Sequence, residues 1–119
     1  MSIIDHNKLQ TMTAGDEDLI ADLAIMFVQR LPALAARIRI GIETGDVDQI
    51  ESGAHQLKSR LSYFGATGLR EQAIELESAA RKRESDRLAK LHTELFDDVD
   101  KLIEELRTLT NLALEVDDD

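Results

Sequence analysis

The sequence contains no cysteine, no tryptophan and a single proline, and aromatic residues make up only 3% of its 119 residues. The absence of cysteine excludes disulfide bonds and thiolate metal sites and is compatible with a reducing compartment. The scarcity of aromatic side chains leaves no platform on which nucleic-acid bases could stack. Cations are also outnumbered, and the net charge of −10 argues against a nucleic acid as the main partner.

No apolar run approaches the ~20 residues that cross a bilayer, so we expect no membrane partner. The first residues, MSIIDHNKLQ, lack the basic and apolar regions of a secretory signal. These absences predict a cytoplasmic protein. The length fits one domain over residues 1–119, with the last few acidic residues frayed. The initiating Met1 and the short tail favour a free-standing protein.

Helical periodicity runs through nearly the whole chain. A short helix is predicted over 5–12, and a second one begins in the acidic turn at 16–18. Because proline lacks an N–H, we expect a bend at Pro32 and a new helix from there. Further helices are predicted over 46–64, 67–80 and 86–109, begun by Asp46, Thr67, and Ser85 or Asp86. The apolar faces are expected to include Met12, Leu19 and Leu109.

Short connections make sequential helices antiparallel neighbours. The predicted fold class is therefore all-α, an up-down antiparallel four-helix bundle with one or two additional N-terminal helices. The leucine seam of the last helix could also drive dimerisation. Packing within one bundle uses the same pattern, and we expect a monomer.

His55 lies in the stretch AHQLKSRLSYFGA, about 130° from the centre of its helix's apolar arc. It should therefore point outward. Residues three and four positions away are its neighbours on that face, namely Glu51, Ser52, Lys58 and Ser59, and Ser62 follows two turns after His55. Short serines would let a partner approach the imidazole, and a lysine could reach an anion attached to it. The spacing alone favours an idle surface histidine on a solvated helix face.

The longer stretch AHQLKSRLSYFGATGLREQAIELE resembles the histidine phosphotransfer (HPt) domain family of two-component phosphorelays. The family's signature places Ala-His-x-Leu-Lys-Gly before a Gly-Ala pair, a leucine three residues on, and a closing Leu-Glu. The matching residues here are Ala54, His55, Leu57, Lys58, Gly65, Ala66, Leu69, Leu76 and Glu77. The chain departs from the signature at Ser59, where the family often has glycine. Serine is the next smallest polar side chain, so access to the histidine should survive.

The resemblance implies a role for each matching residue. His55 would accept and donate the phosphoryl group through one ring nitrogen, and Lys58 would neutralise the phosphoryl oxygens. Glu77 would accept a hydrogen bond from the other ring nitrogen and hold the tautomer, although it could equally be an ordinary surface carboxylate. The small Ser59 would permit docking, on a surface that also includes Ser52, Ser62 and Arg81.

The sequence has no P-loop, no glycine-rich nucleotide loop and no cluster of three acids around a metal position. We therefore expect a phosphoryl carrier and not an enzyme, without a cofactor or metal of its own. The resemblance implies that Mg²⁺ would come from a response-regulator receiver domain, and that a hybrid or sensor histidine kinase would be a further partner. The alternatives are an adaptor that docks on receivers without carrying phosphate, and a plain dimerising bundle.

Three other observations carry less weight. Glu51 and His55 could share a metal ion, but two ligands make a poor site. His92 is expected on the bundle surface, and His6 lies near the N-terminus as an incidental residue. The run Arg81–Arg83 suits a helix C-terminus, which favours cations, and it could also meet an acidic receiver surface.

Overall fold

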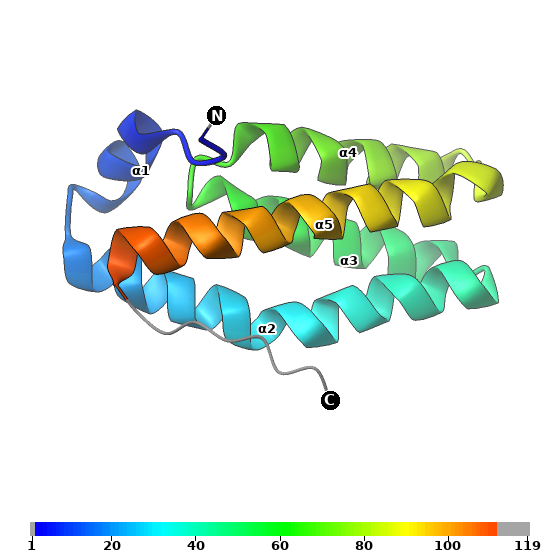
Figure 1. Cartoon of the computed structure of the whole chain (residues 1–119). Helices are drawn as coiled ribbons and strands as arrows, with labels where there is room; N and C mark the ends of the chain where they lie inside the picture. The colour runs from blue at the N-terminus through cyan, green and yellow to red at the C-terminus, as the bar shows by residue number, and fades with distance from the viewer. Residues whose placement is uncertain (1, 112–119) are drawn as a thin grey trace.

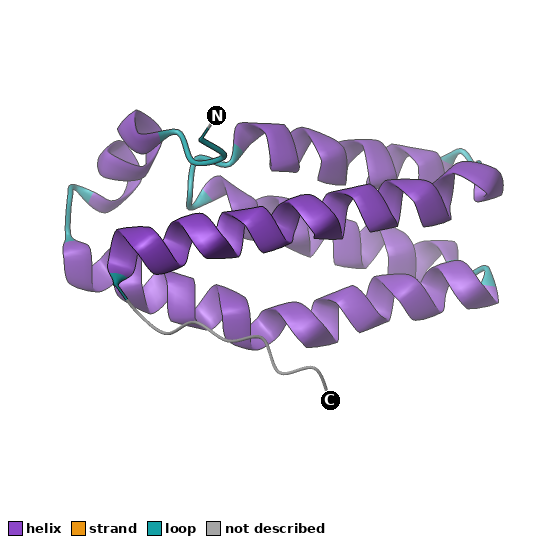
Figure 2. Ribbon diagram, in the orientation of Figure 1, coloured by secondary structure: helices purple, strands orange, loops and turns teal. Residues whose placement is uncertain are grey.

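The computed structural model describes residues 2–111, in which the long helices lie side by side (Figures 1 and 2). Its helices are α1 (His6–Thr13), α2 (Glu17–Thr44), α3 (Val47–Ser62), α4 (Thr67–Arg81) and α5 (Ser85–Thr110). The all-α class is confirmed, with α2–α5 as the bundle and α1 as the additional N-terminal helix. The acidic end for which we expected fraying lies outside the described residues.

The four long helices enclose one hydrophobic core. Contacts join α2 to α3, α3 to α4, α4 to α5 and α5 back to α2, so the helices form a closed ring (Figure 1). Each helix contributes side chains that are fully buried, among them Ile38, Leu57, Leu76 and Leu102. Burial of one such side chain stabilises the fold by about 1.5–3 kcal/mol. This core holds α3 and α4 side by side, where the candidate site lies.

α2 continues through Pro32, so the expected helix boundary at that residue is wrong. The proline denies the carbonyl of Val28 its usual partner, and Figure 1 shows a bend in the middle of α2, the part that holds Pro32. Leu31 and Leu34 are buried on either side of it. Packing of both halves on the bundle outweighs the local cost of the proline, which is about 3 kcal/mol in a helix interior.

By length and composition, α2 is long and apolar enough to cross a membrane, which the search for uninterrupted apolar runs had not indicated. The same helix supplies eight buried residues to the bundle, on the side that faces α3 and α5. A core helix of a soluble protein passes the same test of hydropathy. The apolar character of α2 is therefore mostly that of a core helix.

The predicted caps are confirmed at one of three helix starts. The Asp46 carboxylate accepts a hydrogen bond from the backbone N–H of Gln49 at 3.2 Å and begins α3. Thr67 does not cap α4, because it is the first helical residue and its hydroxyl accepts from Lys8 Nζ. The residue that precedes α5 is Glu84, and no side chain caps that helix.

Three side chains expected in the apolar faces are exposed, namely Met12 at 54%, Leu19 at 40% and Leu109 at 41%. In α2 the buried face is turned by one position, so Ile20 and Ala24 take the places expected for Leu19 and Leu23. The rows of apolar residues at 19–23 and 20–24 both fit a helical period. Only tertiary packing distinguishes them.

Hydrogen bonds hold the N-terminal segment against α5 and against the turn that precedes α4. The backbone N–H groups of Ile3 and Ile4 donate to the Glu105 carboxylate at 2.7 and 2.9 Å. The N–H of Asp5 donates to the carbonyl of Gly65, whose φ of +62° belongs to the left-handed region. A Cβ at Gly65 would lie 2.8 Å from the Asp5 carbonyl oxygen, so this close approach requires glycine.

Gly53 and Gly68 provide a matched test of the packing under α3. A Cβ at Gly53 would lie 2.5 Å from Ile38 Cγ1, whereas a Cβ at Gly68 meets nothing within 4 Å. We expect Gly53→Ala to lower the free energy of unfolding by about 1–3 kcal/mol through overpacking. Gly68→Ala should raise it by up to about 1 kcal/mol, because alanine favours helix. Urea unfolding measures both, and equal effects of the two substitutions would contradict the close packing of α2 on α3.

Candidate functional site

His55 is placed on the outer side of α3 by the residues that α3 buries. These are Ile50, Gly53, Ala54, Leu57 and Leu61, which all face α2, α4 and the core. Position 55 falls opposite their centre, and 61% of the His55 side chain is exposed. The outward orientation predicted from the helical period is therefore the one observed.

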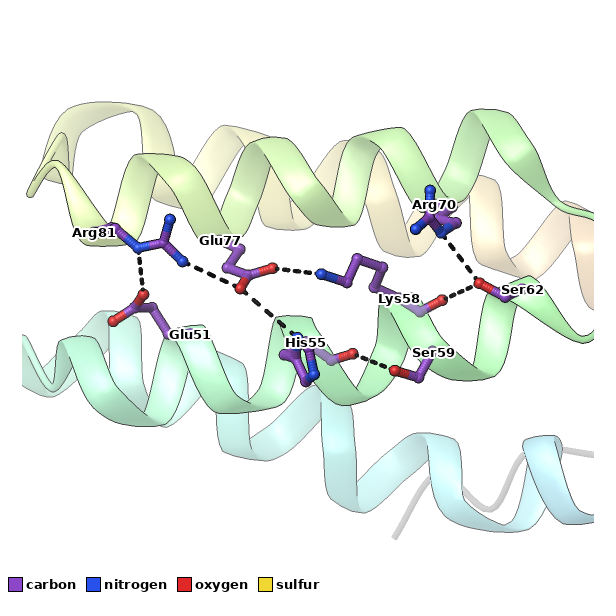
Figure 3. Close-up of polar contacts among 8 residues, drawn as sticks. All are labelled: Glu51, His55, Lys58, Ser59, Ser62, Arg70, Glu77 and Arg81. Carbon is purple, nitrogen blue, oxygen red and sulfur yellow. Dashed lines mark hydrogen bonds and ion pairs between the residues drawn. The ribbon is translucent and has the colours of Figure 1, made fainter.

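Glu77 approaches His55 from α4. Leu76, the preceding residue, is fully buried, and this turns Glu77 toward α3 with only 14% of its side chain exposed. Its Oε1 lies 3.8 Å from His55 Nδ1, slightly longer than a hydrogen bond, and Figure 3 shows the other ring nitrogen directed away from it. One ring nitrogen thus faces a carboxylate, while the other faces outward.

Two cationic side chains also contact the Glu77 carboxylate. Its Oε2 lies 3.4 Å from Lys58 Nζ, and its Oε1 lies 3.3 Å from Arg81, which in turn binds Glu51 at 2.9 Å (Figure 3). A carboxylate that is mostly withdrawn from water needs such counter-charges to remain ionised at low cost. The seam between α3 and α4 is therefore closed by a chain of ion pairs. Sequence reasoning had not identified Glu51 as the partner of Arg81.

The serines beside His55 fold back on their own helix. Ser59 Oγ donates to the carbonyl of His55 at 3.2 Å, and Ser62 Oγ donates to the carbonyl of Lys58 at 3.1 Å. Ser62 also accepts from Arg70 Nε, a contact that no sequence pattern indicated (Figure 3). Ser52 is half-buried one turn before His55. The hydroxyls thus add little height to the helix surface around the imidazole.

The other two histidines have different surroundings. His6 is exposed near the start of the chain, with its Nε2 3.4 Å from the Ser2 hydroxyl. His92 was expected on the surface but is half-buried between α5 and α2, because its ring packs on Phe96 at a centroid distance of 4.7 Å. Its buried Nε2 has no hydrogen-bond partner among the described residues. Neither ring has a carboxylate and a lysine arranged around it as His55 has.

The candidate site is an exposed helix surface. Within residues 2–111, no three side chains of the metal-binding types gather together, and Glu51 is taken up by Arg81. A hollow of about 810 Å³ lies elsewhere, between the N-terminal segment and the start of α4, with Gln72 and Asp98 in its lining. An exposed imidazole backed by a carboxylate suits a group carried on the ring nitrogen and handed to another macromolecule.

The fold and this arrangement define a helical bundle with an exposed histidine beside a carboxylate on its surface. The Hpt domain family matches residues 22–109, and the chain belongs to this family. Hpt domains carry phosphoryl groups on a histidine in phosphorelays, are not kinases, and generally interact with receiver domains. No curated protein and no solved structure matches the chain in the corresponding comparisons.

The half-buried His92 should make stability depend on pH. Burial lowers the pKa of His92 below its ordinary value of 6.5, opposed by a hydrogen bond to the backbone of Ala35 and assisted by the charge of Arg39. The unfolded chain therefore binds this proton more readily than the folded protein does. The stability that the neutral His92 contributes is complete above pH 6.5 and is lost as the pH falls toward the pKa of His92 in the folded protein.

We expect His92→Gln to reduce the fall in unfolding free energy between about pH 7 and pH 5. His6→Gln, a change at an exposed histidine, should leave the wild-type fall intact. Urea unfolding at several pH values measures both. Parallel curves for wild type and His92→Gln would contradict the assignment.

Proposed function

We propose that this protein is a phosphorelay intermediate that accepts a phosphoryl group on His55 and passes it to or from an aspartate of a response-regulator receiver domain. The proposal depends on the different environments of the two nitrogen atoms of the His55 ring. Nδ1 lies 3.8 Å from a carboxylate, while the side chain as a whole is 61% exposed. Membership of the Hpt family supports the reaction type.

In the proposed step, the lone pair of His55 Nε2 attacks the phosphorus of an aspartyl phosphate. A P–N bond forms, the acyl P–O bond breaks, and the receiver's carboxylate leaves with the electron pair. The proton on Nδ1 stays where it is, directed at Glu77, which stabilises the positive charge that develops on the ring. The reverse step restores the same atoms, so the group can flow in either direction.

Lys58 is proposed to neutralise the phosphoryl oxygens. In the unphosphorylated protein its ammonium group contacts Glu77 at 3.4 Å, and 21% of the Lys58 side chain is exposed. A phosphoryl group on Nε2 offers Lys58 a second anion within one helical turn. Arg81 stays on Glu77 at 3.3 Å, so the carboxylate keeps a counter-charge when the lysine turns toward the phosphate.

The partners would supply what this chain does not carry. Phosphoryl transfer consists mostly of positioning and charge neutralisation, and Mg²⁺ is the usual means of the latter. We propose that the receiver domain brings Mg²⁺ with its aspartate, and that a hybrid or sensor histidine kinase feeds the relay in the cytoplasm. The small Ser59, with Ser52, Ser62 and Arg81 around it, would form the surface on which the receiver sits.

The primary test is substitution of the proposed acceptor. His55→Gln should fold normally, because the side chain is exposed, and should lose all phosphate uptake from a phosphorylated receiver. His6→Gln and His92→Gln should retain it. Acid-labile, base-stable label on the intact protein measures the outcome. Binding of a receiver without any transfer would support the non-phosphorylated adaptor instead.

A second test addresses Glu77 with Glu75 as its control on the same helix. Glu77→Gln should slow phosphorylation of His55 by a small phosphoramidate about ten-fold, because the negative charge that faces Nδ1 and stabilises the positive charge developing on the ring is lost. Glu75→Gln removes an ion pair to Arg87 away from the imidazole and should leave the rate unchanged. The ¹⁵N spectrum of His55 should show the Nδ1–H tautomer in wild type and a mixture in Glu77→Gln. An unchanged tautomer and rate would make Glu77 an ordinary surface carboxylate.

A further inference from the structure

A groove runs between α4 and α5, which lie side by side in the bundle (Figure 1). Two hollows of about 810 and 320 Å³ form this α4–α5 groove, and they are continuous because Gln72, Asp98 and Lys101 line both. All the lining residues come from the N-terminal segment, the turn before α4, α4 itself and α5. The reaction proposed for His55 uses none of these residues.

The orientation of α4 separates the groove from the candidate site. Gln72 and Glu77 are five positions apart, so they point about 140° away from each other around the helix axis. Glu77 faces His55 of α3, whereas Gln72 Nε2 donates to Asp98 Oδ2 of α5 at 2.8 Å. A molecule in the groove therefore leaves the imidazole and its carboxylate uncovered.

The groove has apolar walls and an acidic lining. Among the described residues, its charged groups are seven carboxylates and the ammonium group of Lys101, which pairs with Asp98 at 3.3 Å. The apolar side chains are those of Ile3, Ile4, Leu69 and Leu91, and the carboxylates are those of Asp5, Glu75, Glu94, Asp97, Asp98, Glu104 and Glu105. Such a lining complements a ligand that is both apolar and cationic.

The cations around the groove offset only part of its negative charge. Glu75, Glu94 and Glu104 each pair with an arginine or lysine from outside the lining. The Glu105 carboxylate instead accepts from the uncharged backbone N–H groups of Ile3 and Ile4. The groove therefore stays negative, and a cation that enters it meets a favourable potential.

One buried polar atom in the groove lacks a partner. The Gln72 side chain is half-buried and its Nε2 is taken up by Asp98. Its carbonyl oxygen Oε1 is buried and accepts no hydrogen bond within residues 2–111. Because an unpaired buried acceptor is costly, a ligand that donates an N–H to Gln72 Oε1 gains affinity.

The groove has the length of a short peptide. From Leu91 to Glu105, α5 rises about 21 Å at 1.5 Å per residue. An extended chain of about six residues covers that distance at ~3.4 Å per residue. Because side chains alternate along such a chain, three would point into the groove and three toward its edges.

We propose that the α4–α5 groove binds an extended basic segment of a partner protein, which carries apolar and arginine or lysine side chains. The apolar side chains lie against Ile3 and Leu69, the cations meet the carboxylates of the lining, and an N–H of the segment donates to Gln72 Oε1. Since the groove and His55 lie on different sides of α4, this partner holds the protein while the histidine stays free.

The test uses a capped hexapeptide in which leucine and arginine alternate, and two variants that add bulk. Gly68 lines the groove, and a Cβ there would meet nothing within 4 Å, so Gly68→Leu obstructs the groove without disturbing the fold. Ala89→Leu, the control, places the same side chain at an exposed position of α5 outside the lining. Isothermal titration calorimetry and the ¹H–¹⁵N spectrum of each protein measure binding.

We expect wild type and Ala89→Leu to bind the peptide alike, and Gly68→Leu to bind it at least about ten-fold more weakly. A peptide with glutamine in place of each arginine should also bind about ten-fold more weakly at low salt. The amide signals that shift should include those of Gln72 and Asp98 and not that of His55. Phosphorylation of His55 by a small phosphoramidate should proceed at the same rate with and without the peptide.

Three outcomes overturn the proposal. They are no binding to wild type at about 1 mM peptide, equal binding by Gly68→Leu and wild type, and equal binding of the arginine and glutamine peptides. Agmatine, a free guanidinium compound, is a further probe, and binding as tight as that of the peptide would make the groove a small-molecule site instead. The carrier role is measured separately, by phosphate on His55, and is unaffected by these outcomes.

Discussion

Burial of one side of α3 between its two neighbouring helices is the constraint on which the rest of the structure depends. Gly53 lets α2 approach so closely that a methyl group would meet Ile38, and Leu57 fills the core beneath. A helix clamped in this way cannot rotate without exposing its apolar residues, which cost about 1.5–3 kcal/mol each. The position of His55 on the opposite side is therefore fixed by packing several residues away.

Glu77 places a carboxylate next to the His55 ring that is held in this position. Its carboxylate is mostly withdrawn from water, and the charges of Lys58 and Arg81 offset the desolvation that this requires. With two cations in contact, the Glu77 carboxylate has counter-charges other than the imidazole. A neutral ring with one nitrogen oriented is the state from which nucleophilic attack begins. The same ion pairs hold α3 to α4, so stability and the proposed reactivity share one cluster.

The sequence predicted the fold well and the site in part, for physical reasons that individual residues illustrate. The helical period and the cap at Asp46 are local properties, so the direction of His55 could be derived from α3 alone. The continuity of α2 through Pro32 could not, because it depends on packing of both halves against other helices. The half-buried setting of His92 depends likewise on Phe96 and on the facing turn of α2.

The pairing of Arg81 with Glu51 is a further case, since the two residues are 30 positions apart. Spacing of three or four residues identifies neighbours within one helix, as for Glu77 and Arg81. Contacts between helices require the register of α3 on α4, which no local pattern states. The resemblance to the family supplied Glu77 for that reason, whereas the contacts of Glu51 with Arg81 and of Arg70 with Ser62 emerged only from the structure.

A histidine on an exposed helix surface cannot select its partner in the way that an enzyme pocket does. An enzyme pocket selects its substrate by enclosing it, but an imidazole on an open helix is offered to any protein that can reach it. Ser59, with its hydroxyl turned back onto the His55 carbonyl, keeps that surface nearly as low as glycine would. Discrimination must then come from the surrounding surface. In a chain of net charge −10, the charges that lie around His55 are the part of that surface from which discrimination can arise.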